Sequence, residues 1–265
     1  MKGQPSRRIG LHVVQEFPSI EFLSDPWLSQ RLGKKAYRLV IDETIHTRPR
    51  LAEEIVHYLP TGAFVEARVP YEDRVTAVAL EHAGFCPIEE LVTFEIETAE
   101  IVARSTIGLR WAHPADRDEV VHLARQGFTH SRFHLDRDIA STTANEIKAD
   151  WAGGFFAGVR GNRMVVAERR GDIVGFMLLI DVENSTIIDL IAVSEQARGK
   201  GIAADMIGFS VDQKALGVMR IRVGTQAENL PAVSLYSSMG FQPVAKQLTF
   251  HRHVDEENRC RKGER

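Results

Sequence analysis

Cysteine is scarce in this chain, which has only two among its 265 residues, Cys86 and Cys260. They lie far apart and show no CxxC or Cys/His ligand spacing, so neither a disulfide framework nor a zinc site is expected. Long apolar runs are also missing: none approaches the roughly 20 residues that span a bilayer, and the N-terminus lacks a signal-peptide core. We therefore expect a cytoplasmic protein with no membrane partner.

An excess of charge of one sign is absent as well. The chain has 33 Lys+Arg against 36 Asp+Glu, a net charge of -3 at pH 7. Nucleic-acid-binding domains carry a marked basic excess, so no nucleic-acid partner is expected. Hydrophobic residues make up 44% of the chain, which is enough for a packed core and excludes wholesale disorder. The length favours two domains.

Strand-like and helical patterns follow one another along the chain after a mildly polar stretch near residue 100. The expected strands cover residues 107–111, 164–169, 173–181, 186–193, 219–225 and 241–251, and helices are expected from Pro114, Gly201 and Leu230. Arg170-Gly171-Asp172 has the composition of a hairpin turn, which predicts antiparallel neighbours. We expect one domain in residues 1–100, a second in 105–253 and a frayed, charged tail in 254–265.

An internal repeat relates the two halves at a constant offset of 156 residues. Gly84-Phe85-Cys86-Pro87-Ile88 corresponds to Gly240-Phe241-Gln242-Pro243-Val244, and each copy follows a helical stretch and a strand-like run. Chance is the alternative, because Gly-Phe after a helix is common. The repeat predicts that the N-terminal half ends in a copy of the same unit.

A glycine-containing turn is the segment with the clearest chemistry. The strand expected to end at Val193 is followed by Gln196-Ala-Arg198-Gly199-Lys200-Gly201 and at once by an amphipathic helix. Backbone N–H groups at a helix start are unpaired and the helix dipole is positive there, so such a turn suits a pyrophosphate. The spacing fits neither GxxxxGK[ST] nor GxGxxG, which excludes the two common phosphate-binding loops.

Two motifs in this region resemble those of the GCN5-related N-acetyltransferase (GNAT) family. The acyl-CoA motif Q/R-x-x-G-x-G/A is met by Gln196, Gly199 and Gly201. The second CoA segment, N-x-x-A-x-x-x-Y-x-x-x-G-F, is met by Asn229, Ala232, Tyr236, Gly240 and Phe241. The resemblance covers about residues 107 to 253. It implies an α+β GNAT fold, a mixed, mostly antiparallel twisted sheet flanked by helices, preceded here by a smaller degenerate GNAT-like N-terminal domain.

The resemblance also implies a cofactor site and one catalytic residue. Acetyl-CoA is the implied cosubstrate, with no metal, and its expected contacts are Ile191, Ala192, Val193, Gln196, Ala197, Arg198, Gly199, Lys200, Gly201, Ile202, Ala203, Asn229 and Ala232. Tyr236 is the implied acid that protonates the departing thiolate; the alternative is that it only packs on a helix face. In the repeat Tyr236 corresponds to Leu80, and the first half has no RGxG turn, so we expect that half to be non-catalytic.

The acceptor is expected to be a small-molecule amine. Ser131, Arg132, Phe133 and His134, in a segment that follows the first helix of the second domain, resemble a piece of the TDP-fucosamine acetyltransferases, which acetylate the 4-amino group of a dTDP-sugar. Arg132, beside Phe133, would hold the diphosphate and stack on a base or sugar face. This implies a dTDP-amino sugar and polysaccharide biosynthesis. Another small amine or a protein amine is the alternative, as is a non-catalytic binding module, and a homodimer is expected only from family habit.

No general base is evident from the sequence. The candidates by location are His130, His134, Asp136, Glu183 and Asp189, and a water chain is an alternative to any of them. The alternating His251-Arg252-His253 segment is expected at the surface rather than in a metal site.

Overall fold

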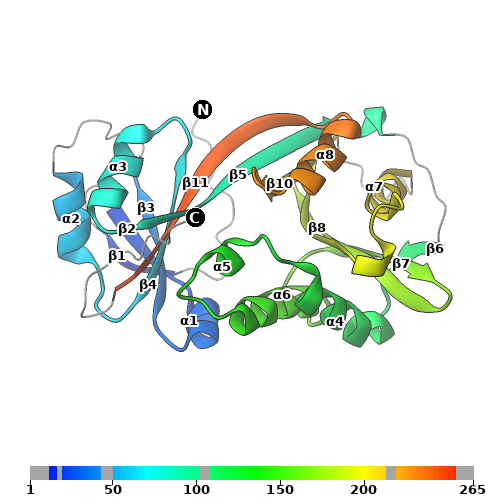
Figure 1. Ribbon diagram of the computed structural model, residues 1–265, viewed down its shortest axis with the longest axis horizontal. Helices are drawn as coiled ribbons and strands as arrows, with labels where there is room; N and C mark the ends of the chain where they lie inside the picture. The colour runs from blue at the N-terminus through cyan, green and yellow to red at the C-terminus, as the bar shows by residue number, and fades with distance from the viewer. Residues whose placement is uncertain (1–11, 17–19, 43–49, 102–107, 213–218, 255–265) are drawn as a thin grey trace. The chain divides into compact units, whose positions relative to one another are not determined.

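The structure is a computed structural model that describes residues 12–16, 20–42, 50–101, 108–212 and 219–254 (Figure 1). Cys260, almost all of the expected tail and most of the expected domain boundary lie outside these residues. Cys86 is disulfide-bonded, contrary to the expectation that no disulfide forms. Contacts divide the chain into unit 1, made of Met1–Glu90, Leu135–Ile139 and Gln247–Arg265, and unit 2, made of Leu91–His134 and Ala140–Lys246. These units are not the two consecutive segments expected from the sequence, because a short central segment and part of the last strand belong to unit 1.

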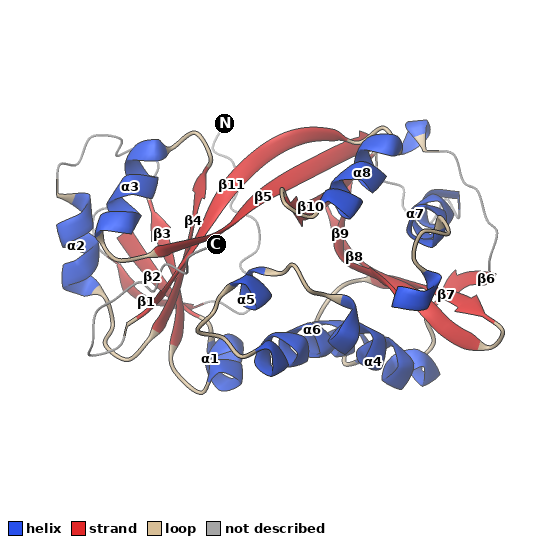
Figure 2. Cartoon of the chain, in the orientation of Figure 1, coloured by secondary structure: helices blue, strands red, loops and turns tan. Residues whose placement is uncertain are grey.

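Unit 1 is a sheet covered by helices (Figure 2). Its elements are β1 (His12–Glu16), β2 (Ile20–Ser24), α1 (Pro26–Leu32), β3 (Ala36–Ile41), α2 (Leu51–Tyr58), β4 (Phe64–Pro70), α3 (Arg74–His82) and parts of β5 (Cys86–Glu97) and β11 (Gln242–His253). The strand order is β1-β2-β3-β4-β11, with β3 and β4 parallel and the other neighbours antiparallel. Ile55 of α2 and Leu80 of α3 are fully buried against this sheet.

Unit 2 contains the remaining elements. They are η1 (Thr98–Glu100), β6 (Gly108–Trp111), η2 (Pro114–Asp116), α4 (Arg117–Gly127), α5 (Arg132–Leu135), α6 (Ser141–Phe156), β7 (Arg163–Arg169), β8 (Asp172–Val182), β9 (Ser185–Val193), η3 (Glu195–Ala197), α7 (Ile202–Asp212), β10 (Arg220–Gln226) and α8 (Leu230–Ser238). The order is β5-β10-β9-β8-β7-β6, and only β9 and β10 are parallel. The mixed, mostly antiparallel sheet therefore agrees with the sequence expectation.

Both faces of the unit 2 sheet are buried at β8, because its consecutive residues are buried and successive side chains of a strand point to opposite faces. Met177 and Leu179 belong to the core that also contains residues of α7 and α8, whereas Phe176 and Leu178 belong to the core beneath α4 and α6. No helix among the described residues is long and apolar enough to cross a membrane.

The internal repeat is confirmed by the secondary structure. An offset of 156 residues maps the bounds of β4, α3 and β5 onto those of β10, α8 and β11. The helix caps match as well: Asp73 and Asn229 each accept a hydrogen bond from the backbone three residues on, and Gly84 and Gly240 each end the turn at positive φ. The pairing is reciprocal, because β11 lies antiparallel to β4 and β5 lies antiparallel to β10.

Candidate active site

The site begins where β9 and β10 separate. The two strands pair in parallel from Ser185 opposite Arg220 to Ile188 opposite Val223, yet β9 continues to Val193 and β10 to Gln226. On its other edge β9 stays paired with β8 as far as Val193. Backbone groups on the β10 side of residues 189–193 are therefore left outside the ladder of the described strands. A cavity of about 530 Å³ opens at this point.

The glycine turn lies at one end of this cavity. Gly199 and Gly201 have φ angles of +73° and +78°, and no other heavy atom lies within 4 Å of where a Cβ would stand. Arg198 donates to the carbonyls of Val193 and Gly127, and the Lys200 ammonium donates to the Gln196 carbonyl. Because these side chains bond the backbone, the turn offers mainly the N–H groups that precede and begin α7.

Most of the residues expected to contact the cofactor line the same cavity. They are Ile191, Ala192, Val193, Ala197, Arg198, Gly199, Gly201, Ile202, Ala203, Asn229 and Ala232; the lining does not include Gln196 or Lys200. Asn229 also has a structural role, because its amide oxygen caps α8 and its amide nitrogen donates to Thr225 Oγ1 at 3.2 Å. The cap fixes the position of α8 next to the separated strands.

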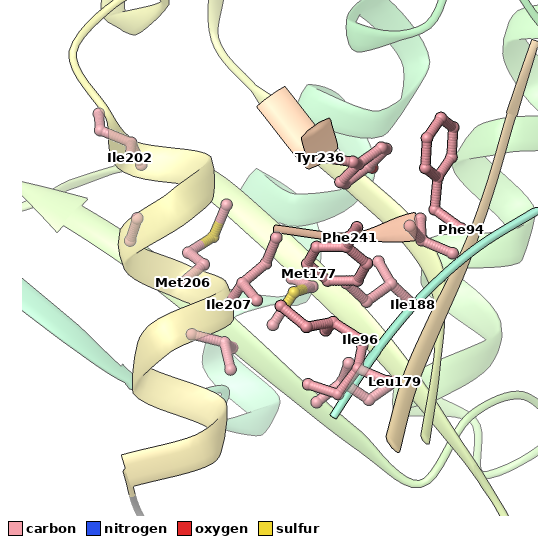
Figure 3. Close-up of a cluster of buried hydrophobic side chains, with 14 of the residues drawn as sticks. Phe94, Ile96, Met177, Leu179, Ile188, Ile202, Met206, Ile207, Tyr236 and Phe241 are labelled. Atoms are coloured by element: carbon pink, nitrogen blue, oxygen red, sulfur yellow. The ribbon is translucent and has the colours of Figure 1, made fainter. Parts of the chain in front are cut away.

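Tyr236 lines the cavity from α8 and is only 2% exposed. Its ring lies 5.9 Å from that of Phe94 and 5.6 Å from that of Phe241, within the apolar cluster of Figure 3. Burial raises the pKa of the Tyr236 phenol above its ordinary value, because the phenolate would lose its hydration. The side chain is therefore held as a neutral proton donor over the physiological pH range.

The structure separates the four residues expected to bind the acceptor. Ser131 lines the 530 Å³ cavity, whereas His134 lines a second cavity of about 640 Å³. Phe133 is 0% exposed, with its ring 5.8 Å from that of Trp151, and the Arg132 guanidinium lies 4.3 Å above the Phe133 ring. Neither Arg132 nor Phe133 belongs to the lining of either cavity, and the ring of Phe133 packs in the core.

The candidate bases have different surroundings. His130 and Asp189 line the 530 Å³ cavity, but both carboxylate oxygens of Asp189 accept from Arg160, at 2.7 and 2.8 Å. Glu183 is exposed in the turn between β8 and β9, and Asp136 belongs to unit 1. Two of the five candidates therefore remain as bases near the site. His130 lines the 530 Å³ cavity and His134 lines the 640 Å³ cavity, and neither is held in a bidentate ion pair as Asp189 is.

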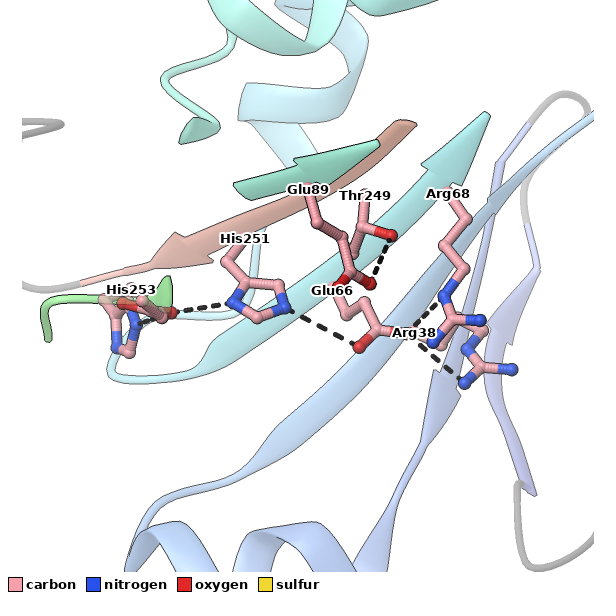
Figure 4. Close-up of polar contacts among 8 residues, drawn as sticks. Arg38, Glu66, Arg68, Glu89, Thr249, His251 and His253 are labelled. Atoms are coloured by element: carbon pink, nitrogen blue, oxygen red, sulfur yellow. Dashed lines mark hydrogen bonds and ion pairs between the residues drawn. The ribbon is translucent and has the colours of Figure 1, made fainter. Parts of the chain in front are cut away.

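The His251-Arg252-His253 segment is buried, which corrects the expectation of a surface location. His251 is 1% exposed and Arg252 is 8% exposed. Asp136 Oδ2 accepts from His251 Nδ1 at 2.7 Å and from His253 Nε2 at 2.9 Å, and His251 faces Glu66 at 3.7 Å (Figure 4). Burial raises the pKa of Asp136, but the two imidazole hydrogen bonds outweigh this and lower the pKa well below its usual range. We assign the cluster a structural role in unit 1.

Lys148 lines the cavity and was missed by the sequence analysis. It is buried on α6, with its ammonium 4.4 Å from the Trp151 ring and 5.0 Å from the Phe128 ring. Ala144, Ile147 and Ala152 of α6 are buried with it, but they form no clear helical period in the sequence, so no local pattern marked Lys148.

Comparisons with known proteins agree with this geometry. Residues 160–243 match the family model described as an acetyltransferase (GNAT) domain. Over 142 residues the chain is 32% identical to the spore coat polysaccharide biosynthesis protein SpsD of Bacillus subtilis (strain 168), which is 53% of this chain and 48% of that protein. The matched segment thus spans about half of the relative's length.

Solved structures show the same fold. A GCN5-related N-acetyltransferase from Sphaerobacter thermophilus superposes with a TM-score of 0.59 at 14% identity, covering 89% of this chain and 77% of the other. A functionally unknown conserved protein from Staphylococcus epidermidis ATCC 12228 superposes with a TM-score of 0.63 at 13% identity, covering 92% and 95%. These likenesses confirm the expected GNAT fold.

Proposed function

We propose, on the premise that residues 160–243 carry an acetyltransferase (GNAT) domain, that the chain transfers the acetyl group of acetyl-CoA to a primary amine. One observation carries the proposal: a single cavity joins the open edge of β9, the glycine turn before α7 and the Tyr236 phenol. A strand edge, a phosphate-binding turn and a proton donor are the three features that transfer from a CoA thioester needs.

The cavity fits the polar groups of CoA. Amide groups of the pantetheine arm would pair with backbone groups of residues 189–193 on the side that faces β10, where the ladder ends at Ile188, as an added strand does. The pyrophosphate would lie against the N–H groups at the start of α7, in the space that a Cβ on Gly201 would enter. The thioester supplies the activated acetyl group, and the protein residues hold it and manage protons.

Tyr236 is the proposed acid. A neutral phenol at the wall of the cavity would protonate the thiolate that leaves as the new C–N bond forms. It would recover its proton from the positively charged nitrogen of the newly formed C–N bond as the neutral amide forms, so its protonation state is restored after each turnover.

For the acceptor we propose the amino group of a nucleotide-linked amino sugar. Support comes from the Ser131 to His134 segment, of which Ser131 lines the cavity, and from the relative's assignment to polysaccharide biosynthesis. We further propose that residues 1–100 are a degenerate copy of the fold without catalysis of their own: Leu80 takes the place of Tyr236 and is fully buried.

Thiol release from acetyl-CoA tests the function. The purified chain is assayed with dTDP-4-amino sugars, UDP-amino sugars, polyamines and a peptide amine, and an amine-free reaction corrects for hydrolysis. Turnover with a nucleotide-linked amino sugar is the expected result. Acetyl-CoA binding without turnover on any amine would refute the transferase and favour a binding module.

A further inference from the structure

Three side chains between the two cavities form a hydrogen-bonded chain. Ser131 Oγ lies 2.6 Å from His134 Nδ1, and His134 Nε2 lies 2.9 Å from Asn145 Oδ1. Ser131 lines the 530 Å³ cavity, while His134 and Asn145 line the 640 Å³ cavity. This series of hydrogen bonds therefore begins at the proposed acetyl-transfer cavity and ends beside the second cavity.

The hydrogen bonds define the protonation of the neutral imidazole. An amide oxygen only accepts hydrogen bonds, so His134 Nε2–H donates to Asn145 Oδ1. Nδ1 then carries the lone pair and accepts a hydrogen bond from the Ser131 hydroxyl. In this tautomer the lone pairs of Ser131 Oγ remain available to a donor in the cavity.

Burial is the main reason that the neutral form of His134 is favoured. Burial lowers the pKa of His134, and the nearby Lys148 and His130 lower it further, against the opposing effect of the Asn145 hydrogen bond. Arg125, which lines the same cavity, is paired with Glu146 at 2.6 Å. A ring that is neutral near pH 7 is able to accept a proton.

We infer that Ser131 and His134 relay a proton from the acceptor ammonium, with Ser131 touching the amine and His134 acting through it as the base. The inference rests on the proposed transferase function and names the proton acceptor that the sequence left open. Asn145 is a positioning residue, since it holds the tautomer in which Nδ1 faces Ser131.

The proton transfer balances. The ammonium gives one proton to Ser131 Oγ as the serine proton passes to His134 Nδ1, so a cationic amine and a neutral imidazole become a neutral amine and an imidazolium. The amine then forms the C–N bond while the C–S bond breaks, and the second proton lost by nitrogen ends on the thiol. His134 lines the 640 Å³ cavity, through which the imidazolium returns its proton to water.

The decisive variant is His134→Asn. Its amide oxygen keeps an acceptor near the position of Nδ1 for the Ser131 hydroxyl but does not titrate. His122→Asn is the matched control, an exposed histidine on α4. Ser131→Ala removes the first member of the relay, and Ser131→Thr restores a hydroxyl. Acetyl-CoA affinity, measured by calorimetry, reports whether each variant keeps the cofactor site.

The pH profile of kcat/KM for the amine distinguishes a relay from a structural role. With the relay, wild type and His122→Asn show a plateau between the pKa of His134 and that of the amine. For His134→Asn and Ser131→Ala we expect a loss of about hundredfold at pH 7, in the range of a general base. Their rates should then rise about tenfold per pH unit until the amine deprotonates by itself, with unchanged acetyl-CoA affinity and with Ser131→Thr recovering the plateau.

The outcomes separate the two proposals. Suppose that wild type turns over an amine, and that kcat/KM of His134→Asn equals that of wild type or is lower by the same factor at every pH. The relay is then wrong and the transferase stands. If wild type turns over no amine in the panel, the transferase is refuted and the relay with it.

Discussion

Replacing Gly201 by valine should abolish CoA binding, because the new side chain would block the pyrophosphate. This steric effect can be measured apart from the effect of backbone strain. Gly201 has φ of +78° and open space where a Cβ would stand. A non-glycine residue in this conformation costs about 1–2 kcal/mol of stability. In addition, the branched side chain would occupy the space through which a pyrophosphate approaches the helix N–H groups.

The effect on affinity follows from the bonds that would be lost. A hydrogen bond to a charged group contributes about 1.5–3 kcal/mol, so losing two to the pyrophosphate costs about 3–6 kcal/mol. The Kd for CoA should rise at least about hundredfold, as measured by isothermal titration calorimetry.

Gly158→Val is the matched control. Gly158 is exposed after α6, has φ of +71° and also has no heavy atom within 4 Å of a Cβ. Both variants should lose similar stability in chemical denaturation, but only Gly201→Val should lose CoA binding. Equal Kd values for the two variants would refute the assignment of the turn to the pyrophosphate.

Three further predictions test other parts of the molecule. Tyr236→Phe keeps the packing against its neighbours and removes only the hydroxyl, so turnover in the thiol-release assay should fall at least about tenfold while the Kd for acetyl-CoA stays the same; equal turnover would remove the acid assignment. Asp136→Asn should cost about 3–5 kcal/mol in urea denaturation at pH 6 by removing the carboxylate that accepts from the buried His251 and from His253. Burial lowers the pKa of His251, but Asp136 and Glu66 raise it more, so that the pKa lies above the ordinary value of 6.5. The stability that the pairing with His251 gives the wild type is therefore fully present below pH 6.5 and is lost as the pH rises through the folded-state pKa. An equally steep loss of stability with pH in the variant would contradict this. Leu80→Ala should destabilise the fold by about 2–5 kcal/mol without changing the Kd for acetyl-CoA at a temperature where the variant is folded, and a weakened Kd would implicate unit 1 in cofactor binding.

Local patterns in the sequence were sufficient to predict the strand, turn and helix of the proposed cofactor site. The strand ending at Val193, the turn at Gly199 and Gly201 and the helix after it occur where the apolar periodicities and glycines place them. The repeat was also readable, since equal spacing of caps and glycines reproduces equal element bounds. Hydrogen bonds within helices and turns connect residues close in sequence, so these features depend on neighbouring residues.

Helix α6 shows where the local pattern was incomplete. No helix was expected at Ser141–Phe156, although the structure has one with Lys148 buried on it. Its small residues Ala144, Ala149 and Ala152 are buried alongside the larger Ile147, so the apolar stripe is too broad to give a clear helical period.

Contacts between distant residues decided the rest. His251 and His253 alternate along a strand as surface residues do, but Asp136, 115 and 117 residues away, meets them in unit 1. Phe133 lies in the segment expected to bind the acceptor, yet tertiary packing buries its ring and directs Ser131 toward one cavity and His134 toward another. The sequence by itself determined the strand, turn and helix that would hold CoA, because the hydrogen bonds of the turn and helix are local and an apolar run marks the strand. Only the tertiary structure decided which polar groups are buried together, because that depends on strand pairing and loop placement between residues far apart in the chain.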